Sequence, residues 1–153
     1  MKKRFLLVIL MLACLFAFTG CGKDASHSAS AKLNVGDNGV AIMTVDLTGD
    51  YSVEFASGAV YFYEGEVSDE TLAHGFIITE DEYNDEVKYF EEKEDLDGEY
   101  KKLEDGGFYY KDASYIEYFV PSKDGYYVKV VVNDTDLSKA NDIYTRFEAS
   151  KVE

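Results

Sequence analysis

The segment IEYFVPSKDGYYVKVVV, residues 116–132, predicts two paired strands whose register can be tested against the residue pattern. The loop Lys123-Asp124-Gly125 is a favoured hairpin connection when it forms a type I turn closed by Gly125 in the left-handed region. A loop of two or four residues would put Glu117 or Lys129 on a core surface, so the three-residue loop is predicted. It gives one continuous apolar surface, in which Ile116, Tyr118 and Val120 face Val132, Val130 and Val128.

Further strands are predicted outward from this hairpin. Residues 108–110, Phe-Tyr-Tyr, follow a turn signal and supply a third strand beside it. Residues 40–47 and 51–56 are strand-like and flank the turn signal Thr48-Gly49-Asp50. Alternation of apolar and polar side chains in 51–56 gives one wet face, so the two segments predict a second hairpin.

The middle of the chain predicts two more strands and a helix. The strands are the apolar runs 59–63 and 76–78, with a short helical turn over 68–74 between them. Thr79 and Glu82 have the spacing of a capping box, in which each side chain bonds the backbone N–H of the other residue. The helix is expected to run to about Lys93, with its apolar stripe against the sheet. That stripe comprises Tyr83, Val87 and Phe90.

A second helix is expected to close the chain. Asp136, or Thr135 before it, is its predicted cap. The apolar residues at helical spacing are Ala140, Ile143, Tyr144 and Phe147. The order of strands, helix, strands and helix predicts an α+β fold, with an antiparallel sheet of about five to seven strands and two main helices.

The first 21 residues have three successive parts. A cationic start of Lys2, Lys3 and Arg4 precedes the uncharged apolar run 5–18, which is shorter than the roughly 20 residues of a membrane-spanning helix. The run ends at Phe18-Thr19-Gly20-Cys21. This segment resembles bacterial lipoprotein signal peptides, although Phe18 stands where that family usually has Leu.

The resemblance implies cleavage between Gly20 and Cys21 and a diacylglyceryl group on the Cys21 sulfur. It also implies a location on the extracytoplasmic face of the cell membrane, held by two acyl chains. We therefore expect a signal peptide at 1–20, a lipidated cysteine with a flexible linker at 21–38, and one small α+β domain at 39–153.

The charge of the chain narrows the function. Its 15 basic and 30 acidic residues give a formal charge of −15, and loss of residues 1–20 with their three positive charges gives −18. Nucleic-acid binding is disfavoured, because phosphate contacts need Lys and Arg. His27 and His74 are the only histidines, and no Cys-x-x-Cys or His-x-x-x-His motif occurs. Zinc and nucleophilic chemistry are therefore disfavoured, and we expect a non-enzymatic binding or interaction domain.

Two sets of residues are candidate sites. Tyrosines on neighbouring strands offer rigid amphipathic area for an unknown envelope protein, a glycan or a cationic ligand. Those selected are Tyr109, Tyr115 and Tyr127. The alternative is calcium binding, because residues 93–104 resemble an EF-hand loop, with Lys93 at the first ligand position. The acidic residues of that loop are Asp95, Asp97, Glu99 and Glu104. Apart from the diacylglyceryl group and this possible calcium, no cofactor is expected.

Overall fold

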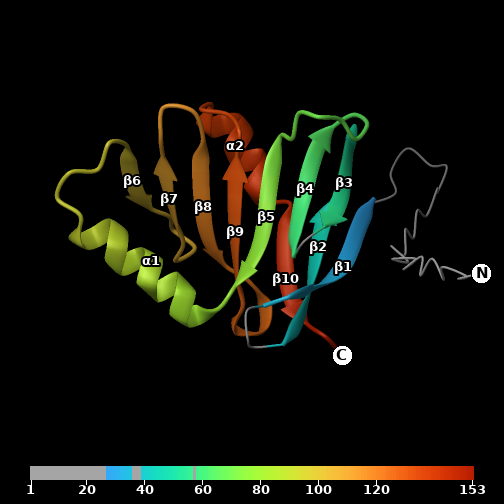
Figure 1. Cartoon of the computed structure of the whole chain (residues 1–153), viewed down its shortest axis with the longest axis horizontal. Coiled ribbons are helices and arrows are strands. Elements are labelled where there is room, and N and C mark those ends of the chain that lie inside the picture. Colours follow the sequence, from blue (N-terminus) through green and yellow to red (C-terminus); the bar gives the residue numbers. More distant parts are fainter. Residues whose placement is uncertain (1–26, 36–38, 57) are drawn as a thin grey trace, which may run out of the picture.

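The computed structural model describes residues 27–35, 39–56 and 58–153, so the predicted signal peptide and Cys21 lie outside the described residues. Ten strands and two α-helices occur in this part of the chain (Figure 1). The strands are β1 (Ser28–Asn34), β2 (Val40–Asp46), β3 (Tyr51–Ala56), β4 (Ala59–Glu64), β5 (Ala73–Ile78), β6 (Glu99–Lys102), β7 (Phe108–Lys111), β8 (Ile116–Pro121), β9 (Tyr127–Val132) and β10 (Phe147–Lys151). The helices are α1 (Glu80–Glu92) and α2 (Leu137–Tyr144), and a short 3-10 turn, η2 (Lys123–Gly125), joins β8 to β9.

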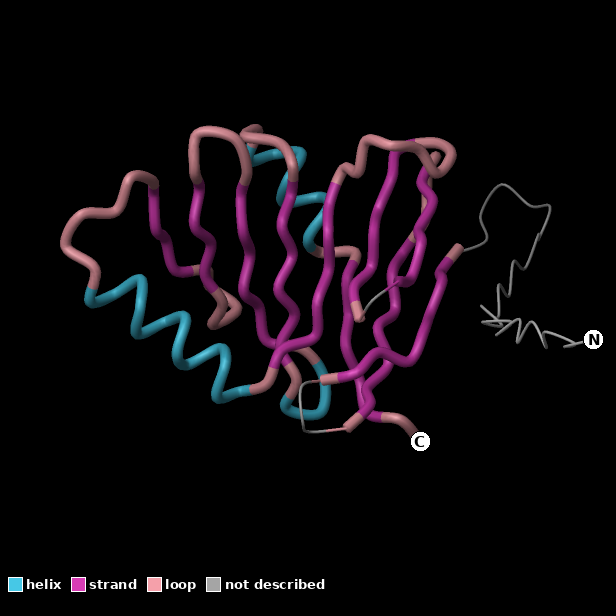
Figure 2. The backbone as a smooth tube through the Cα atoms, in the orientation of Figure 1, coloured by secondary structure: helices cyan, strands magenta, loops and turns pink. Residues whose placement is uncertain are grey.

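The strands form two antiparallel sheets (Figure 2). The larger has seven strands in the order β3-β4-β5-β9-β8-β7-β6, and the smaller has three in the order β1-β2-β10. The predicted α+β class is confirmed. The expectation of one sheet missed the smaller sheet, which carries both the start and the end of the described chain. None of the described helices is both long enough and apolar enough to span a membrane.

The seven-stranded sheet has a buried cluster on each face. The three-stranded sheet and α2 cover one face, and the largest fully buried members there are Met43, Phe62, Ile116, Tyr118 and Ile143. Helix α1 packs on the other face, which we call the helix face. Its cluster comprises Tyr83, Phe90, Phe108, Tyr110 and Phe119.

The predicted stripe of α1 is confirmed, since Tyr83 and Phe90 are buried and Val87 packs beside them. The capping box of Thr79 and Glu82 is confirmed as well.

The predicted register of the central hairpin is confirmed. Ile116 faces Val132, and the pairing continues to Val120 and Val128. The turn differs from the type I prediction, because Asp124 and Gly125 both have positive φ, 58° and 80°, as the central residues of a type I′ turn do. The Asp124 carboxylate accepts a hydrogen bond from the Lys151 backbone N–H at 2.9 Å, which ties the turn to β10.

Two predictions for the first third of the chain are wrong. The linker expected at 21–38 contains strand β1, so the ordered domain begins before residue 39. Strands β2 and β3 do not form a hairpin, because β1 and β10 occupy both edges of β2 and β3 pairs with β4 in the other sheet. The turn signal at 48–50 marks a crossing between the sheets.

Two helical predictions are also wrong. Helix α2 begins after the predicted cap Asp136 but ends at Tyr144, and Phe147 starts strand β10. Phe147 pairs with Val45 of β2 and is buried against the larger sheet. Its apolar side chain is therefore a core residue of a strand and not of the helix. Residues 68–74 contain no helical turn, since the chain bends at 69–70 and at 72 and enters β5 at Ala73.

Candidate functional site

A row of directly opposed residues crosses the helix face from one sheet edge to the other. From β3 to β6 it comprises Glu54, Tyr61, His74, Val131, Glu117, Tyr110 and Tyr100. Helix α1 covers the β6 and β7 end of the row, where the rings of Phe90 and Tyr110 stack with centroids 4.9 Å apart. Tyr61 and Val131, toward the other end, are only partly buried and belong to neither buried cluster. The helix therefore leaves part of the sheet uncovered.

A groove of about 270 Å³ lies between α1 and strands β7 and β8. We call it the α1 groove. Its lining residues are Glu86, Tyr89, Phe90, Lys93, Leu96, Tyr110, Tyr115 and Glu117. It combines aromatic walls with two carboxylates, and convergent polar groups on an apolar wall are the usual composition of a binding site.

Two carboxylates share one ammonium group at the sheet side of the groove. The Lys129 Nζ lies 3.6 Å from a Glu117 oxygen and 4.0 Å from a Glu86 oxygen, both longer than a hydrogen bond. The Glu117 side chain is 19% exposed, and burial is the main reason why its pKa is raised, opposed by Lys129. Lys129 also lies over the Phe119 ring, 4.8 Å from its centroid. Glu86, Glu117 and Lys129 together carry a net charge of −1, while the further cation of the groove, Lys93, lies in its outer part. Because the Glu117 side chain is partly desolvated, an added cation beside it is attracted more strongly than in water.

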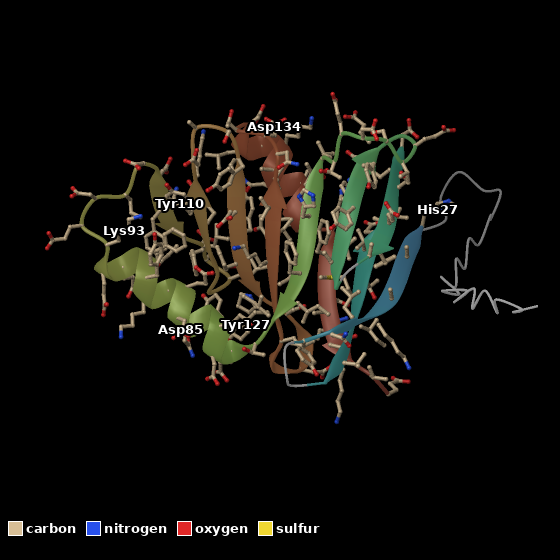
Figure 3. The ribbon with its side chains drawn as sticks, viewed as in Figure 1. His27, Asp85, Lys93, Tyr110, Tyr127 and Asp134 are labelled. Atoms are coloured by element: carbon tan, nitrogen blue, oxygen red, sulfur yellow. The ribbon has the colours of Figure 1, made fainter. Side chains whose placement is uncertain are left out.

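The outer part of the groove is aromatic. Lys93 donates a hydrogen bond from Nζ to the Tyr89 hydroxyl at 2.8 Å and lies 5.0 Å from the centroid of that ring. Figure 3 shows Lys93 and Tyr110 near the C-terminal end of α1, with Tyr127 toward the N-terminal end. Burial raises the pKa of the Tyr115 hydroxyl, and the charge of Glu117 adds to the effect. Tyr115 therefore stays a neutral hydrogen-bonding group at physiological pH.

The three tyrosines selected from the sequence do not converge. Tyr109 is buried on the opposite face, where its hydroxyl donates to Glu99 at 2.9 Å. Tyr127 stacks on Tyr83 of α1 with centroids 4.2 Å apart. Tyr115 precedes β8, whereas Tyr127 pairs with Pro121 at the far end of that strand, so the two lie roughly 20 Å apart. Of the three, Tyr115 alone lines the α1 groove.

The four acidic residues selected for calcium are not gathered around one point. Glu99 begins strand β6, and Glu104 lies beyond its end, which separates them by about 15 Å of nearly extended chain. Calcium ligands must all lie within about 2.6 Å of the ion. Gly98 lies in the same segment 93–104, and close packing accounts for it, because a Cβ atom at this position would come within 2.8 Å of the Tyr110 ring. Within the described residues, no group of three or more His, Cys, Asp or Glu side chains is placed to hold a metal ion.

Three aromatic residues of the uncovered sheet were missed as candidates. Tyr61 and His74 are directly opposed on β4 and β5, and their rings meet edge to face with centroids 5.0 Å apart. Phe76 of β5 faces Lys129. It lines a shallow depression of about 710 Å³ near the end of β5 and the first turn of α1. Burial lowers the pKa of His74, so its ring is neutral at pH 7. We call Glu54, Tyr61, His74, Phe76 and Val131 together the open face.

No protein-family model matches the chain, and the comparisons with curated proteins and with solved structures found no match either. The chemistry of the site therefore rests on its own residues. A half-buried pair of carboxylates with tyrosine walls can bind a cationic group by charge and by contact with the aromatic rings.

Proposed function

We propose that this chain is a lipid-anchored protein of the cell envelope, held outside the cytoplasm, that binds a ligand carrying an ammonium or guanidinium group in the α1 groove. Glu117 carries the argument. Its side chain is mostly buried, and its nearest cation, Lys129, is shared with Glu86. A ligand cation would complete this incomplete charge pairing.

The groove suits such a ligand in shape and in chemistry. Its volume of about 270 Å³ is that of a small group rather than of a whole drug-sized molecule. Tyr89 and Tyr115 supply π faces and hydroxyls on the walls, while Glu86 and Glu117 supply negative charge. A neutral ligand would leave Glu117 with only the 3.6 Å contact to Lys129, which Glu86 shares.

The proposed location rests on the resemblance of residues 1–21 to lipoprotein signal peptides. The strong negative charge of the remaining chain is consistent with a lipid as its hold on the membrane, because anionic lipid attracts basic rather than acidic surfaces. Replacement of Cys21 by Ala tests this part. The Cys21→Ala protein should lose the acyl chains by mass spectrometry and leave the detergent phase in partitioning; unchanged partitioning would contradict the anchor.

Ligand binding is tested by NMR titration of the full-length protein in detergent with N-acetyl-lysine amide and N-acetyl-arginine amide, and with neutral N-acetyl-glutamine amide for comparison. The cationic probes should shift the resonances of residues around Glu117, and Glu117→Gln should weaken their binding about tenfold, equivalent to ~1.4 kcal/mol. Glu64→Gln is the matched control, since Glu64 is exposed at the end of β4. Equal binding by the neutral probe, or by the Glu117→Gln protein, would refute the proposal.

A further inference from the structure

We infer that the ligand of the α1 groove is a basic, extended segment of another protein, which continues from the groove across the open face to Glu54. This inference rests on the proposed function and adds the chemical class of the partner. It follows from the arrangement of charges and aromatic rings along the cross-strand row.

The row places a carboxylate at each end of the uncovered sheet. Glu117 and Glu54 are separated by four strand spacings, through Val131, His74 and Tyr61. At about 4.8 Å per spacing, the two positions lie roughly 19 Å apart. An extended peptide advances about 3.3 Å per residue, so cationic residues six positions apart reach both carboxylates when the peptide crosses the strands.

The surface between the two carboxylates is apolar and aromatic. Tyr61, His74, Phe76 and Val131 are each partly exposed, on adjacent strands β4, β5 and β9. Covering this surface with apolar side chains removes it from water, which favours binding. Aromatic side chains also lose little conformational entropy on binding, because they have only two rotatable bonds. Apolar residues between the two cationic positions of the partner would cover this surface.

Charge selects this partner over a second copy of the chain. On the stretch of the helix face from β3 to β9, Lys129 is the one cation among the described residues, and two carboxylates already engage it. His74 adds no positive charge at pH 7, because burial lowers its pKa. A second copy packed on this face would bring its own Glu54 and Glu117 close to those of the first copy, and these like charges would repel. A basic segment matches both carboxylates and is also attracted by the charge of −18 that remains without residues 1–20.

The test compares the full-length protein with two ligands in parallel. The first is N-acetyl-lysine amide, which fills only the groove, and the second is the capped peptide GKGLGLGKG, whose lysines are six positions apart. The peptide should bind at least about tenfold more tightly than the amino acid and more tightly than GKGLGLGQG. Its affinity, measured by calorimetry, should fall severalfold with Glu54→Gln and with Tyr61→Ser.

The same two substitutions separate this inference from the proposed function. Both should leave the binding of N-acetyl-lysine amide unchanged, whereas Glu117→Gln should weaken both ligands. If Glu54→Gln and Tyr61→Ser do not alter peptide affinity while Glu117→Gln does, the partner does not cross the open face and this inference is wrong. If neither ligand binds, both proposals fail. A circular dichroism spectrum like that of the unsubstituted protein is required for each variant, and Glu54→Gln, at an exposed position, is the one least able to disturb folding.

Discussion

The ring of Phe147 on β10 lies directly against the backbone of Gly75 on β5, so that a Cβ atom at position 75 would come within 2.6 Å of two ring carbons. The two residues belong to different sheets, and the Phe147 ring also lies 5.6 Å, centroid to centroid, from that of Phe62 on β4. The absence of a side chain at Gly75 thus determines how closely the small sheet packs on the large one.

Gly75→Ala should destabilise the protein by about 1–3 kcal/mol, because the added methyl group overpacks this contact. Urea unfolding followed by circular dichroism measures the loss. In a Phe147→Leu background the same substitution should cost distinctly less, since the ring that it strikes is gone. Equal costs in the two backgrounds would show that the ring is not the obstacle.

Ser122→Ala should lower the free energy of unfolding by about 1–3 kcal/mol, because it leaves backbone groups of β10 without partners. The Ser122 hydroxyl accepts from the Ala149 N–H at 2.8 Å and donates to the Ala149 carbonyl at 3.0 Å. Hydrogen exchange should show faster opening at Ala149. Ser114→Ala, at an exposed position between β7 and β8, is the control and should change stability by less than about 0.5 kcal/mol.

Thr79→Ala should cost about 1 kcal/mol through loss of the cap of α1. The Thr79 hydroxyl accepts from the Glu82 N–H at 3.2 Å, and a Glu82 carboxylate oxygen accepts from the Thr79 N–H at 2.7 Å. Thr79→Ser keeps the hydroxyl and should recover most of the lost stability in thermal unfolding. Failure of serine to do so would assign the effect to the threonine methyl group instead.

The stability difference between Glu117→Gln and the unsubstituted protein should depend on pH. Burial raises the pKa of Glu117 in the folded state, so this carboxyl favours folding most below its unfolded pKa, ordinarily about 4.3. That contribution is lost as pH rises through the folded pKa. Glu117→Gln should therefore gain in relative stability between pH 4 and pH 7 in urea unfolding. A difference that stays constant over this range would contradict the raised pKa.

The pH dependence of ligand binding is an independent test of the raised pKa of Glu117. A cationic ligand requires the charged carboxylate, so its affinity should fall on acidification at a pH above the ordinary pKa of glutamate. Titration of N-acetyl-lysine amide at several pH values measures this midpoint. In the Glu86→Gln protein the midpoint should move down, because the charge of Glu86 contributes to the raised pKa of Glu117.

Local patterns predicted the elements whose stability is local. The β8–β9 register followed from Glu117 and Lys129, which had to stay off the apolar surface, and helix α1 followed from its capping box. The smaller sheet could not be predicted from local sequence patterns of this kind. Strand β1 is rich in Ser and Ala, and it is held by backbone pairing with β2, by buried Leu33 and by a 2.8 Å hydrogen bond between the hydroxyls of Ser30 and Thr44.

The candidate site was predicted only in part, because strand order assembles it. His74 and Val131 become neighbours through the pairing of β5 with β9, which are far apart along the chain. No local spacing of residues indicates such a contact. Tyr115 was selected from the sequence as one tyrosine of a tyrosine-rich stretch, whereas Tyr61 could be recognised only once β4 was placed beside β5.

The early start of β1 has a consequence for the proposed anchor. Only six residues separate Cys21 from Ser28, a contour length of about 25 Å. Ser28 pairs with Asp46, and the Gly65 N–H donates to the Asp50 carbonyl, so the end of the domain nearest the proposed anchor also carries the acidic residues around the β4–β5 connection, Glu64, Glu66, Asp69 and Glu70. An anionic bilayer would repel that end over a screening length of about 10 Å. The distance between the domain and the lipid would then depend on the ionic strength of the surrounding medium. It would be shorter at high salt and longer in a dilute medium.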